Sequence, residues 1–436
     1  MSTDTAKGAL PKGWRQLALK DACELITDGS HFSPTTVEKG IPYITVRDLG
    51  DSGIDFMHCK FVTRESFLEL ARSGCQPFKN DVLFSKDGTV GKVALVNDDR
   101  EFVVLSSLAI VRPNQETVSS AFLKLSMQSP SFLETALGLK TGTALRRIVL
   151  RNLKTVSMAV PPLSEQEKIV EILEEQLSHL DAALASVNSV REKAARFRLS
   201  LLHAAFTGAL TGHDSSKEAI PESWALVELE ALLSVSIGGI WGEESGLLEV
   251  DVDVVRVTEL KAHGVIEPST AAKRSITRKQ FESRALQVGD LLLEKSGGGP
   301  NTPVGRVGYV SSIDKPTVCS NFMQLMRPDM GKIRPVFLHL FLTFIHSKGE
   351  TIPMQTSTTN IRNIKTPQYM ASLVPCPQLD EQETIIAILD EQLSRLDSSL
   401  AIADLIEKKA LAMRRSLLHA AFTGVLTKEW RVGAHV

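Results

Sequence analysis

The stretch Ser200-Leu-Leu-His-Ala-Ala-Phe-Thr-Gly208 recurs letter for letter as Ser416 to Gly424. The match extends upstream without a gap: residues 163–212 align with 379–428 at a constant offset of 216, and 29 of the 50 positions are identical. A long internal repeat of this kind reports on the architecture of the whole chain, so it is interpreted before any local pattern. It predicts one structural element that occurs twice.

Each copy of the repeat predicts one long helix. Capping boxes at Ser164 and Asp380 mark the two helix starts, and Gly208 and Gly424 mark the ends as C′ residues. Apolar residues recur between them at intervals of three and four, which makes a narrow stripe that one helix cannot bury alone. The predicted seam consists of Ile169, Leu173, Leu177, Leu180, Leu184, Ile385, Leu389, Leu393, Leu396 and Leu400, and it continues through Val187, Val190, Ala194, Phe197 and Leu201 and their counterparts 216 residues later.

The order of charges predicts how the two helices pair. In both helices the front half is mainly acidic and the rear half mainly basic. An antiparallel pair sets each acidic half against a basic one, whereas a parallel pair sets acid beside acid. Complementarity with the dipole of each helix alone would give the same bias, which weakens the argument without reversing it. We expect an antiparallel coiled coil with internal pseudo-twofold symmetry.

The remaining chain forms two blocks of domain size that share a framework. Both open with Pro-x-x-Trp, at Pro11 and Pro221, and both contain the same order of strand-like runs. We align Arg151–Thr155 of the first block with Arg362–Thr366 of the second. The predicted class is α+β, with two mixed α/β domains that alternate with the two helices. The expected boundaries are 1–10 for an N-terminal arm, 11–160 for domain 1, 161–212 for helix 1, 213–220 for a linker, 221–377 for domain 2, 378–428 for helix 2 and 429–436 for a tail.

Basic segments are the clearest candidates for contact with nucleic acid. Phosphate binding needs positive side chains with hydroxyl or backbone donors nearby, and the run 140–156 meets this without a single acid. One such run is more often a solvated face, but the recurrence in both blocks makes the functional interpretation about equally good. The candidates are Lys140, Thr141, Thr143, Arg146, Arg147, Arg151 and Lys154 in the first block, and Lys273, Arg274, Arg278, Lys279, Thr358, Asn360, Arg362 and Lys365 in the second.

Two glycine-rich segments, 87–93 and 296–302, resemble phosphate-binding loops only superficially. The first lacks the Ser or Thr that holds Mg²⁺ in a P-loop, since Val93 stands there, and the second is not a dinucleotide fingerprint. Turns between strands are the better interpretation. Such loops on a basic face could enter a DNA groove, which would bring Ser85, Lys86, Thr89, Lys295, Asn301 and Thr302 near base edges.

Composition narrows the class of protein. The chain has 49 Lys and Arg against 51 Asp and Glu, so it is not a polycation that coats nucleic acid non-specifically. Its five cysteines are scattered without a C-x-x-C pair, which favours a reducing cytoplasm, and no apolar run approaches the length of a membrane span. We find no catalytic motif and no metal-spaced histidine pair, so we expect neither catalytic nor metal-binding residues.

Over essentially its whole length the chain resembles the specificity (S) subunit of type I restriction-modification systems. The resemblance rests on the two helix starts, the Leu-Leu-His-Ala-Ala-Phe-Thr-Gly ends and the Pro-x-x-Trp openings. The segment Ile26–Pro34 also resembles the Thr-Asp-Gly-Thr-His-x-Thr-Pro loop of the family's target-recognition domains, which adds Thr27, Asp28, Ser30 and His31 as candidates for DNA contact. The second domain departs from this loop, with Ser236-Ile-Gly-Gly-Ile-Trp-Gly242 in its place.

The resemblance implies a non-catalytic protein that reads a bipartite site in double-stranded DNA. It implies as partners two methyltransferase (M) subunits and two restriction (R) subunits, with S-adenosylmethionine bound by M, ATP and Mg²⁺ by R, and no cofactor in this chain. Two alternatives stay open: a stand-alone adenine methyltransferase with a degenerate motif, for which Val160-Pro-Pro-Leu163 is a poor match, and a coiled-coil scaffold that binds only proteins.

Overall fold

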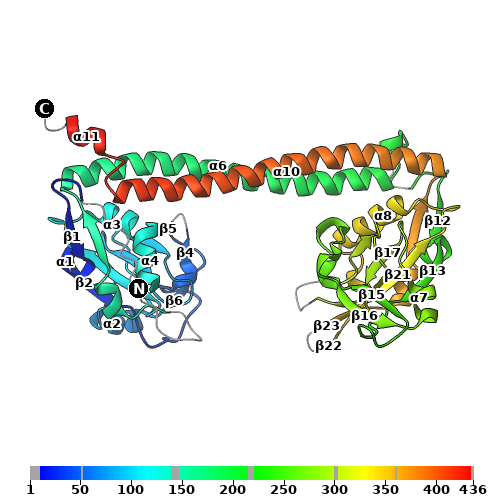
Figure 1. The fold of residues 1–436 in the computed structure, drawn as a ribbon. Helices are drawn as coiled ribbons and strands as arrows, with labels where there is room; N and C mark the ends of the chain where they lie inside the picture. Colours follow the sequence, from blue (N-terminus) through cyan, green and yellow to red (C-terminus); the bar gives the residue numbers. More distant parts are fainter. Residues whose placement is uncertain are drawn as a thin grey trace. The chain divides into compact units, whose positions relative to one another are not determined.

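The computed structural model describes residues 10–50, 53–138, 147–214, 220–298, 303–358 and 361–433. These residues form two compact units (Figure 1). The chain divides between Val187 and Asn188 and again between Ala403 and Asp404. Both divisions fall inside the long helices α6 (Leu163–Phe206) and α10 (Leu379–Phe422), which confirms the two predicted helices. Each unit therefore contains one domain, the beginning of one helix and the end of the other.

The domain of the first unit is built on small sheets covered by short helices. Its central sheet has the antiparallel strand order β2–β10–β7–β8, and a second sheet, β6–β3–β9, contains the parallel pair β3–β9. The strands are β1 (Arg15–Ala18), β2 (Cys23–Asp28), β3 (Ile41–Ile44), β4 (Leu49–Gly50), β5 (Gly53–Ile54), β6 (Lys60–Val62), β7 (Val82–Ser85), β8 (Val93–Leu95), β9 (Val103–Val104), β10 (Leu108–Pro113) and β11 (Ser157–Val160). The helices are α1 (Leu19–Ala22), α2 (Arg64–Arg72), α3 (Ser120–Met127), α4 (Pro130–Gly138) and α5 (Leu150–Lys154).

The domain of the second unit repeats this topology. Its central sheet, β13–β21–β17–β19, corresponds strand for strand to the first, and β16–β15–β20 corresponds to β6–β3–β9 with the same parallel pair. The strands are β12 (Ala225–Glu228), β13 (Leu233–Gly238), β14 (Glu243–Glu244), β15 (Val250–Val255), β16 (Ala272–Ile276), β17 (Leu291–Glu294), β18 (Ser296–Gly297), β19 (Val307–Tyr309), β20 (Thr317–Cys319), β21 (Met323–Pro328), β22 (Gln355–Thr358), β23 (Ile361–Ile364) and β24 (Leu373–Cys376). The helices are α7 (Arg278–Arg284), α8 (Pro335–Ser347) and α9 (Thr366–Met370). One fold occurs twice, as the shared framework predicts.

The ends of the long helices belong to the domain cores. In the first unit Phe422 of α10 packs edge-to-face on Phe122 of α3, with ring centroids 5.3 Å apart. In the second unit Phe206 of α6 packs on Phe337 and Phe341 of α8 at 5.3 and 5.2 Å. Edge-to-face aromatic pairs of this kind stabilise a core beyond the area that they bury. The phenylalanine of the repeated Ala-Ala-Phe motif thus joins each helix end to a domain.

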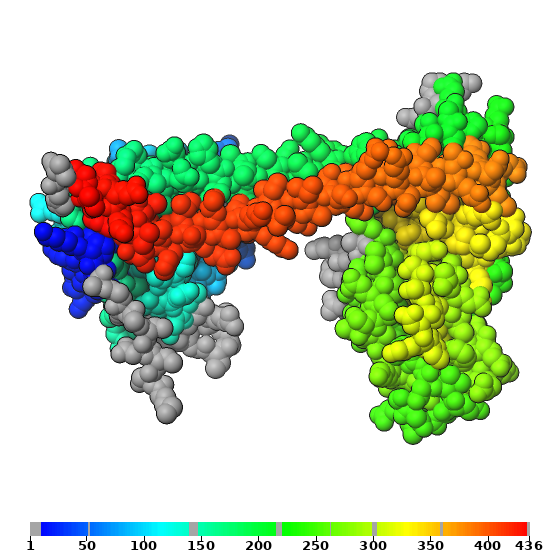
Figure 2. Space-filling view, turned by 45° about the horizontal axis from the view of Figure 1, so that its top comes forward, coloured from blue at the N-terminus to red at the C-terminus, as the bar shows by residue number. Residues whose placement is uncertain are grey.

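The repeated glycines and the two opening prolines meet at these helix ends. Gly208 and Gly424 have φ angles of 79° and 75°, in the left-handed region that favours glycine at the C′ position. A β-carbon on Gly208 would overlap Cγ of Pro221, and one on Gly424 would overlap Cγ of Pro11. In Figure 2 the red end of α10 lies directly against the blue beginning of the first domain. Both the turn and the proline contact require glycine.

A buried or half-buried glutamate completes each junction. Glu165, in the first turn of α6, accepts hydrogen bonds from the Trp14 indole at 2.9 Å and from Thr427 at 2.6 Å, and it also pairs with Arg431. Glu381, in the first turn of α10, accepts from the Trp224 indole at 3.1 Å, from Thr211 at 2.6 Å and from His213. The segment expected as a C-terminal tail contains the short helix α11 (Lys428–Gly433). Because Arg431 of this helix pairs with Glu165, the helix is fixed to the first unit.

The two helix starts differ from the predicted capping boxes. Both helices begin one residue earlier, at Leu163 and Leu379, so Ser164 and Asp380 lie within the first turn. Fully buried glutamines bind the helix starts instead. Gln166 accepts from Ser119 N at 2.9 Å and donates to the carbonyls of Thr117 and Pro161, and Gln382 repeats this arrangement with Arg334 N, Lys332 O and Pro377 O. The repeated Glu-Gln-Glu sequence fixes the helix to its domain.

Within each unit the two helices run antiparallel, as the charge order predicts. In the first unit Asp181, from the acidic half of α6, pairs with Arg414, from the basic half of α10. In the second unit Arg198, from the basic half of α6, pairs with Asp397. The separation in sequence from Asp181 to Arg198 equals that from Asp397 to Arg414. As the chain advances along α6 the partner therefore moves back along α10, which is the pattern of an antiparallel pair. These exposed ion pairs select the orientation more than they stabilise the fold.

The predicted seam is buried where the helices pack on the domains and less completely buried farther along each helix. Ile169, Leu173, Leu177, Ile385 and Leu389 are buried, and Leu180, Leu184, Leu393, Leu396 and Leu400 are half-buried. Of the predicted seam positions farther along α6, Val187, Ala194 and Leu201 stay buried, at intervals of seven. The expectation was wrong for Val190, Phe197, Ile406 and Met413, which are 42–58% exposed. Ala194 and Ala410 are buried in this part of the contact, whereas the apolar side chains that flank them are exposed.

Buried ion pairs explain two motifs that both domains share. Arg112 binds Asp81 through two hydrogen bonds of 2.8 Å, and Arg327 binds Asp290 through bonds of 2.7 and 2.8 Å. Both carboxylates are about 99% buried. Bidentate geometry is what offsets the cost of burying such charges.

Across the described ranges no helix combines the length and hydropathy that a membrane crossing requires.

Replacing Gln166 by Leu is expected to lower the free energy of unfolding by about 3 kcal/mol, because it leaves a buried N–H and two carbonyls without partners. Gln382→Leu should do the same in the second unit. Urea denaturation followed by circular dichroism measures both effects. Gln176→Leu is the matched control, because Gln176 is exposed on the same helix; an equal loss in this control would contradict the assigned role.

The stability of the second unit should fall in acid through Glu259. Burial alone would raise the pKa of this carboxylate, but hydrogen bonds from Arg256, Thr270 and Thr258 lower the pKa to about 2. Its contribution is complete above the unfolded pKa, about 4.3, and is lost as pH falls towards 2. Glu259→Gln should lower the melting temperature at pH 7 and flatten its decline between pH 5 and 2. Glu267→Gln, on the exposed side of the same loop, should change neither.

Candidate nucleic-acid interface

The loop after β2 borders a groove of about 600 Å³ in the first domain. The groove is lined by the predicted residues Thr27, Asp28, Ser30 and His31, together with residues of α2 and Leu150 at the start of α5. Gly29 lets this loop cross the chain closely, because a β-carbon there would overlap the carbonyl oxygens of Val104 and Leu105. The structure thus explains the glycine of the Thr-Asp-Gly motif and brings four predicted residues to one surface.

Charged groups of this loop are already paired. Lys86 Nζ lies 3.2 Å from Asp28 Oδ1, and its side chain is only 10% exposed. His31 Nε2 lies 3.4 Å from Asp28 Oδ2, and His31 is itself largely exposed. Ser30 is buried, and its hydroxyl donates to the carbonyl of Phe32 at 2.7 Å. Among these residues His31 presents the most accessible polar side chain.

Two candidates for DNA contact in the glycine-rich loop of the first domain differ in exposure, since Ser85 is buried and Thr89 is exposed. Ser85 is fully buried; its hydroxyl donates to Thr89 O and accepts from Lys92 N, both at 2.7 Å. Ser85 therefore supports the turn and presents no donor to a groove. Thr89 is exposed at the tip of the turn, where contact with DNA stays a prediction.

Only part of the basic run of the first domain is described. Lys140, Thr141, Thr143 and Arg146 lie outside the described residues. Arg147 and Arg151 are exposed and Lys154 is half-buried, with the last two on α5. Arg151 lies next to Leu150, which lines the groove, so the loop and the basic helix belong to one surface.

The structure corrects the alignment of this run with the second domain. Arg151–Lys154 is helical in α5, whereas Arg362–Ile364 is extended in β23. The N–H of Ile148 donates to Lys86 O, and the N–H of Ile364 donates to Lys295 O, so these two isoleucines are the true counterparts. The constant offset of 216 therefore begins before the long helix. The similar sequences of Arg151–Thr155 and Arg362–Thr366, which are 211 residues apart, suggested the wrong alignment.

In the second domain the candidates gather on a three-stranded ribbon, β18–β23–β22. Arg362 lies opposite Gly297 and Ser357 in the register, Lys365 follows β23 and is exposed, and Thr358 ends β22. Lys295 precedes β18 and is half-buried. Asn301, Thr302 and Asn360 lie outside the described residues. The ribbon presents hydroxyl groups and cations together, as phosphate binding requires.

A separate group of cations lies on β16 and at the start of α7. Lys273, Arg278 and Lys279 are exposed, and the Arg274 guanidinium lies 4.4 Å from the ring centroid of Trp241. Trp241 stands where the first domain has His31. Sequence reasoning missed this stacked pair, because the two residues are 33 positions apart and only the pairing of β14 with β16 brings them together.

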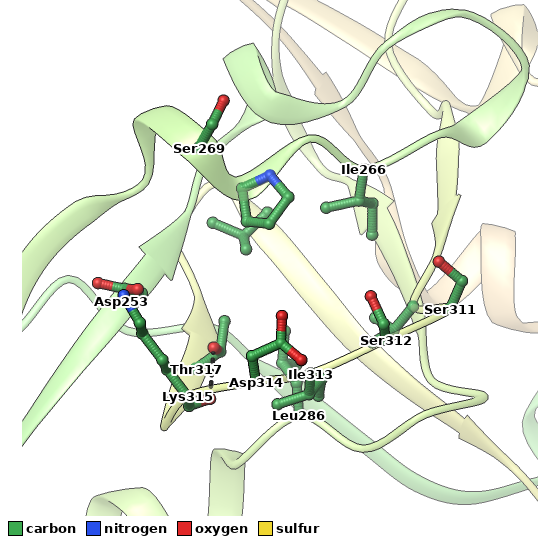
Figure 3. Close-up of a pocket in the computed structure, with 13 residues that line it drawn as sticks. Asp253, Ile266, Ser269, Leu286, Ser311, Ser312, Ile313, Asp314, Lys315 and Thr317 are labelled. Carbon is green, nitrogen blue, oxygen red and sulfur yellow. Dashed lines mark hydrogen bonds between the residues drawn. The ribbon is translucent and has the colours of Figure 1, made fainter.

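Neither metal binding nor an enclosed active site emerges from the described residues. No group of three potential metal ligands occurs among them. A hollow of about 230 Å³ in the second unit is lined by apolar side chains that include Ile266 and Leu286 and by charged ones that include Asp253 and Lys315 (Figure 3). It contains none of the predicted contact residues.

Comparison with known proteins reveals what these domains resemble. Residues 11–184 match a family model described as "Type I restriction modification DNA specificity domain". The chain is 23% identical to the StySPI specificity subunit of a type I restriction enzyme from Salmonella potsdam, over 98% of this chain and 92% of that protein. It is also 23% identical to the EcoBI specificity subunit from Escherichia coli, over 96% and 87%.

A solved structure shares the fold. It comes from work on the complex assembly and conformational transition of a type I R-M system, and it superposes with a TM-score of 0.65 at 17% identity, covering 96% of this chain and 100% of the other.

Gly29→Ala and Gly239→Ala should each destabilise the protein by about 3 kcal/mol, because their β-carbons would overlap backbone carbonyls that cannot move aside cheaply. Gly239 replaces Gly29 in the second domain, and it lies equally close to the carbonyls of Cys319 and Ser320. Thermal unfolding measures the loss. Gly138→Ala is the control, since a β-carbon there meets nothing within 4 Å; a similar loss at Gly138 would refute the close-approach explanation.

Proposed function

Because the chain belongs to the family of type I restriction-modification specificity subunits, we propose that it reads a bipartite DNA target, one half with each domain. The observation that supports this most directly is that two domains with the same central sheet order carry different residues at equivalent surface positions. Asp28 and His31 of the first loop correspond to Gly238 and Trp241 of the second. A shared framework with unlike surfaces suits two readers of different sequences.

We propose that the reading is done by loops and ribbons on each domain. The loop at 27–31 and α5 would serve the first half-site, and the β18–β23–β22 ribbon with the cations of β16 and α7 would serve the second. Side chains of this kind fix register through phosphate contacts and read sequence through base edges in the major groove. The candidates Arg147, Arg151, Lys273, Arg278, Lys279, Arg362 and Lys365 stay predictions of contact.

The outward-facing apolar side chains of the helices support docking of partner subunits. In the second unit Val190 and Phe197 of α6 are 42% and 48% exposed, and in the first unit Ile406 and Met413 of α10 are 43% and 58% exposed. Each pair occupies the position of the other in the 216-residue repeat. Large exposed apolar side chains at regular helical spacing typically mark protein contacts. Two equivalent surfaces suit two methyltransferase subunits, and two restriction subunits would complete the assembly.

We propose that this chain performs no catalysis in that complex. S-adenosylmethionine would be bound by the methyltransferase subunits, and ATP with Mg²⁺ by the restriction subunits, in the cytoplasm where DNA is accessible. The rivals are a stand-alone adenine methyltransferase and a scaffold that binds only proteins. Methyl transfer to DNA by the purified chain alone would favour the first. Absence of salt-dependent DNA binding, even with the methyltransferase subunit present, would favour the second.

Sequencing of modified adenines in cells with and without this gene tests the proposal. We expect one bipartite motif, two short specified halves separated by an unspecified spacer, that is methylated only when the gene is present. Exchange of domain 1 for that of a relative should change one half of the motif and leave the other. A methylation pattern that does not depend on the gene would contradict the function.

The helices predict how the spacer is set. Seven residues inserted within 186–195 of α6, and seven more at the facing point within 400–409 of α10, keep the heptad phase. They lengthen the pair by about 10 Å, or about three base pairs. The motif should keep both halves and gain a spacer of that length. Substitution of seven residues without insertion is the control, and an unchanged spacer would refute the ruler.

A further inference from the structure

One equivalent position carries a carboxylate in the first domain and no side chain in the second. Asp28 ends β2 opposite Ala109 of β10, and Gly238 ends β13 opposite Gln324 of β21. These partners lie three residues before Arg112 and Arg327, the arginines of the two buried ion pairs. The register of the sheets therefore equates Asp28 with Gly238.

The lysine beside this position is held identically in both domains. Lys86 N donates to Ser107 O, and Lys86 O accepts from Ile148 N. Lys295 N donates to Phe322 O, and Lys295 O accepts from Ile364 N. Both lysines directly follow the central strands β7 and β17. The backbones of the two lysines thus lie at the same point of the fold, and the surroundings of their side chains differ.

In the first domain the ammonium group is neutralised. Lys86 Nζ lies 3.2 Å from Asp28 Oδ1, the Lys86 side chain is 10% exposed, and His31 lies on the other oxygen of the same carboxylate. The two charges lie close together beneath the loop, although Asp28 Oδ1 accepts no hydrogen bond. An ion pair enclosed to this degree leaves no net charge to offer a ligand.

In the second domain the carboxylate is missing and the positive charge is doubled. A β-carbon on Gly238 would lie 3.3 Å from Lys295 Nζ, so Lys295 reaches the space that Asp28 fills in the first domain. No carboxylate of the described residues pairs with Lys295, and the neighbouring Glu294 is bound by Arg306. Arg284 Nε donates to Gly238 O at 3.1 Å and adds a second cation. Burial lowers the pKa of Lys295, as expected where no anion compensates the lost hydration.

We propose that Lys295 binds a negatively charged or carbonyl oxygen of the second DNA half-site, and that the residue at the position of Asp28 and Gly238 decides whether the lysine is available. The inference rests on the proposed DNA-reading function and deepens it. A single ammonium with Arg284 beside it suits a phosphate oxygen or the O6 edge of guanine. In the first domain the ion pair with Asp28 makes Lys86 less available for such a contact than Lys295.

The test restores the missing carboxylate. Gly238 has no positive φ, so Gly238→Asp introduces no backbone strain, and the close neighbour of its β-carbon is the end of a flexible side chain. Full-length protein with its methyltransferase subunit is titrated onto a duplex that contains the mapped target, at several salt concentrations. Gly238→Asp and Lys295→Met should each weaken binding about tenfold, the effect of one charge-assisted hydrogen bond. Gly238→Ala is the matched control and should stay within about twofold of the wild type.

The double variant separates the mechanism from simple repulsion. If Asp at 238 acts by occupying Lys295, Gly238→Asp with Lys295→Met should bind no more weakly than either single variant. Additive losses would overturn the proposal, because the new carboxylate would then be repelling DNA directly. Unchanged binding in Lys295→Met would overturn it as well. Lys295→Arg, which keeps the charge, should retain most of the affinity and so separates the loss of charge in Lys295→Met from a general loss of folding at this position.

The first domain supplies the contrasting measurement. Lys86→Met should lower the melting temperature, because it leaves the Asp28 carboxylate without its partner, and should weaken DNA binding less than Lys295→Met does. A loss equal to that of Lys295→Met would overturn the asymmetry between the domains.

Two arms identify the acceptor. Loss of a phosphate contact weakens binding to target and random duplex alike and reduces the salt slope by about 1, whereas loss of a guanine contact is confined to the second half-site. Failure of the wild-type complex to bind any DNA would instead refute the proposed function itself.

Discussion

Two glutamates at the starts of the long helices organise the whole molecule. Glu165 binds the tryptophan that opens the first domain and the threonine that follows α10, and Glu381 binds the tryptophan that opens the second domain and the threonine that follows α6. Each carboxylate thus joins three segments that are distant in sequence. Because the ends of one helix meet the start of the other, the antiparallel pairing and the attachment of both domains are a single structural requirement.

Much of this architecture is predictable because the repeat is long and nearly gapless. Charge order along the helices gives their orientation, and Gly208 and Gly424 give their ends. The pattern of Ser164 and Glu167 predicts a capping box, but the helix begins at Leu163. Tertiary hydrogen bonds of Gln166 hold its first turn, and these cannot be predicted from local sequence. Val190 and Phe197 were placed in the seam by spacing alone. Periodicity alone does not predict that Ala194 is buried in the contact between the helices while Val190 and Phe197 are exposed.

The candidate interface is less predictable, because exposure depends on contacts between remote segments. The sequence does not show whether a basic residue in a loop has a carboxylate partner. Lys86 and Lys295 therefore look equivalent until the structure places Asp28 beside the first and Gly238 beside the second. Ser85 resembles a loop donor, yet β10 and the turn that ends at Lys92 bury it. The pair of Arg274 with Trp241 requires the register of β14 and β16.

The discontinuous first unit has a consequence for how the chain folds during synthesis. Its core includes Leu418, Ala421 and Phe422, which leave the ribosome about 240 residues after Leu177, the preceding buried residue of that core. The second unit is continuous in sequence, from Asn188 to Ala403. The usual order, in which the N-terminal domain matures first, is therefore reversed: the domain made first waits, with part of its apolar surface uncovered, until the last helix is released and closes it.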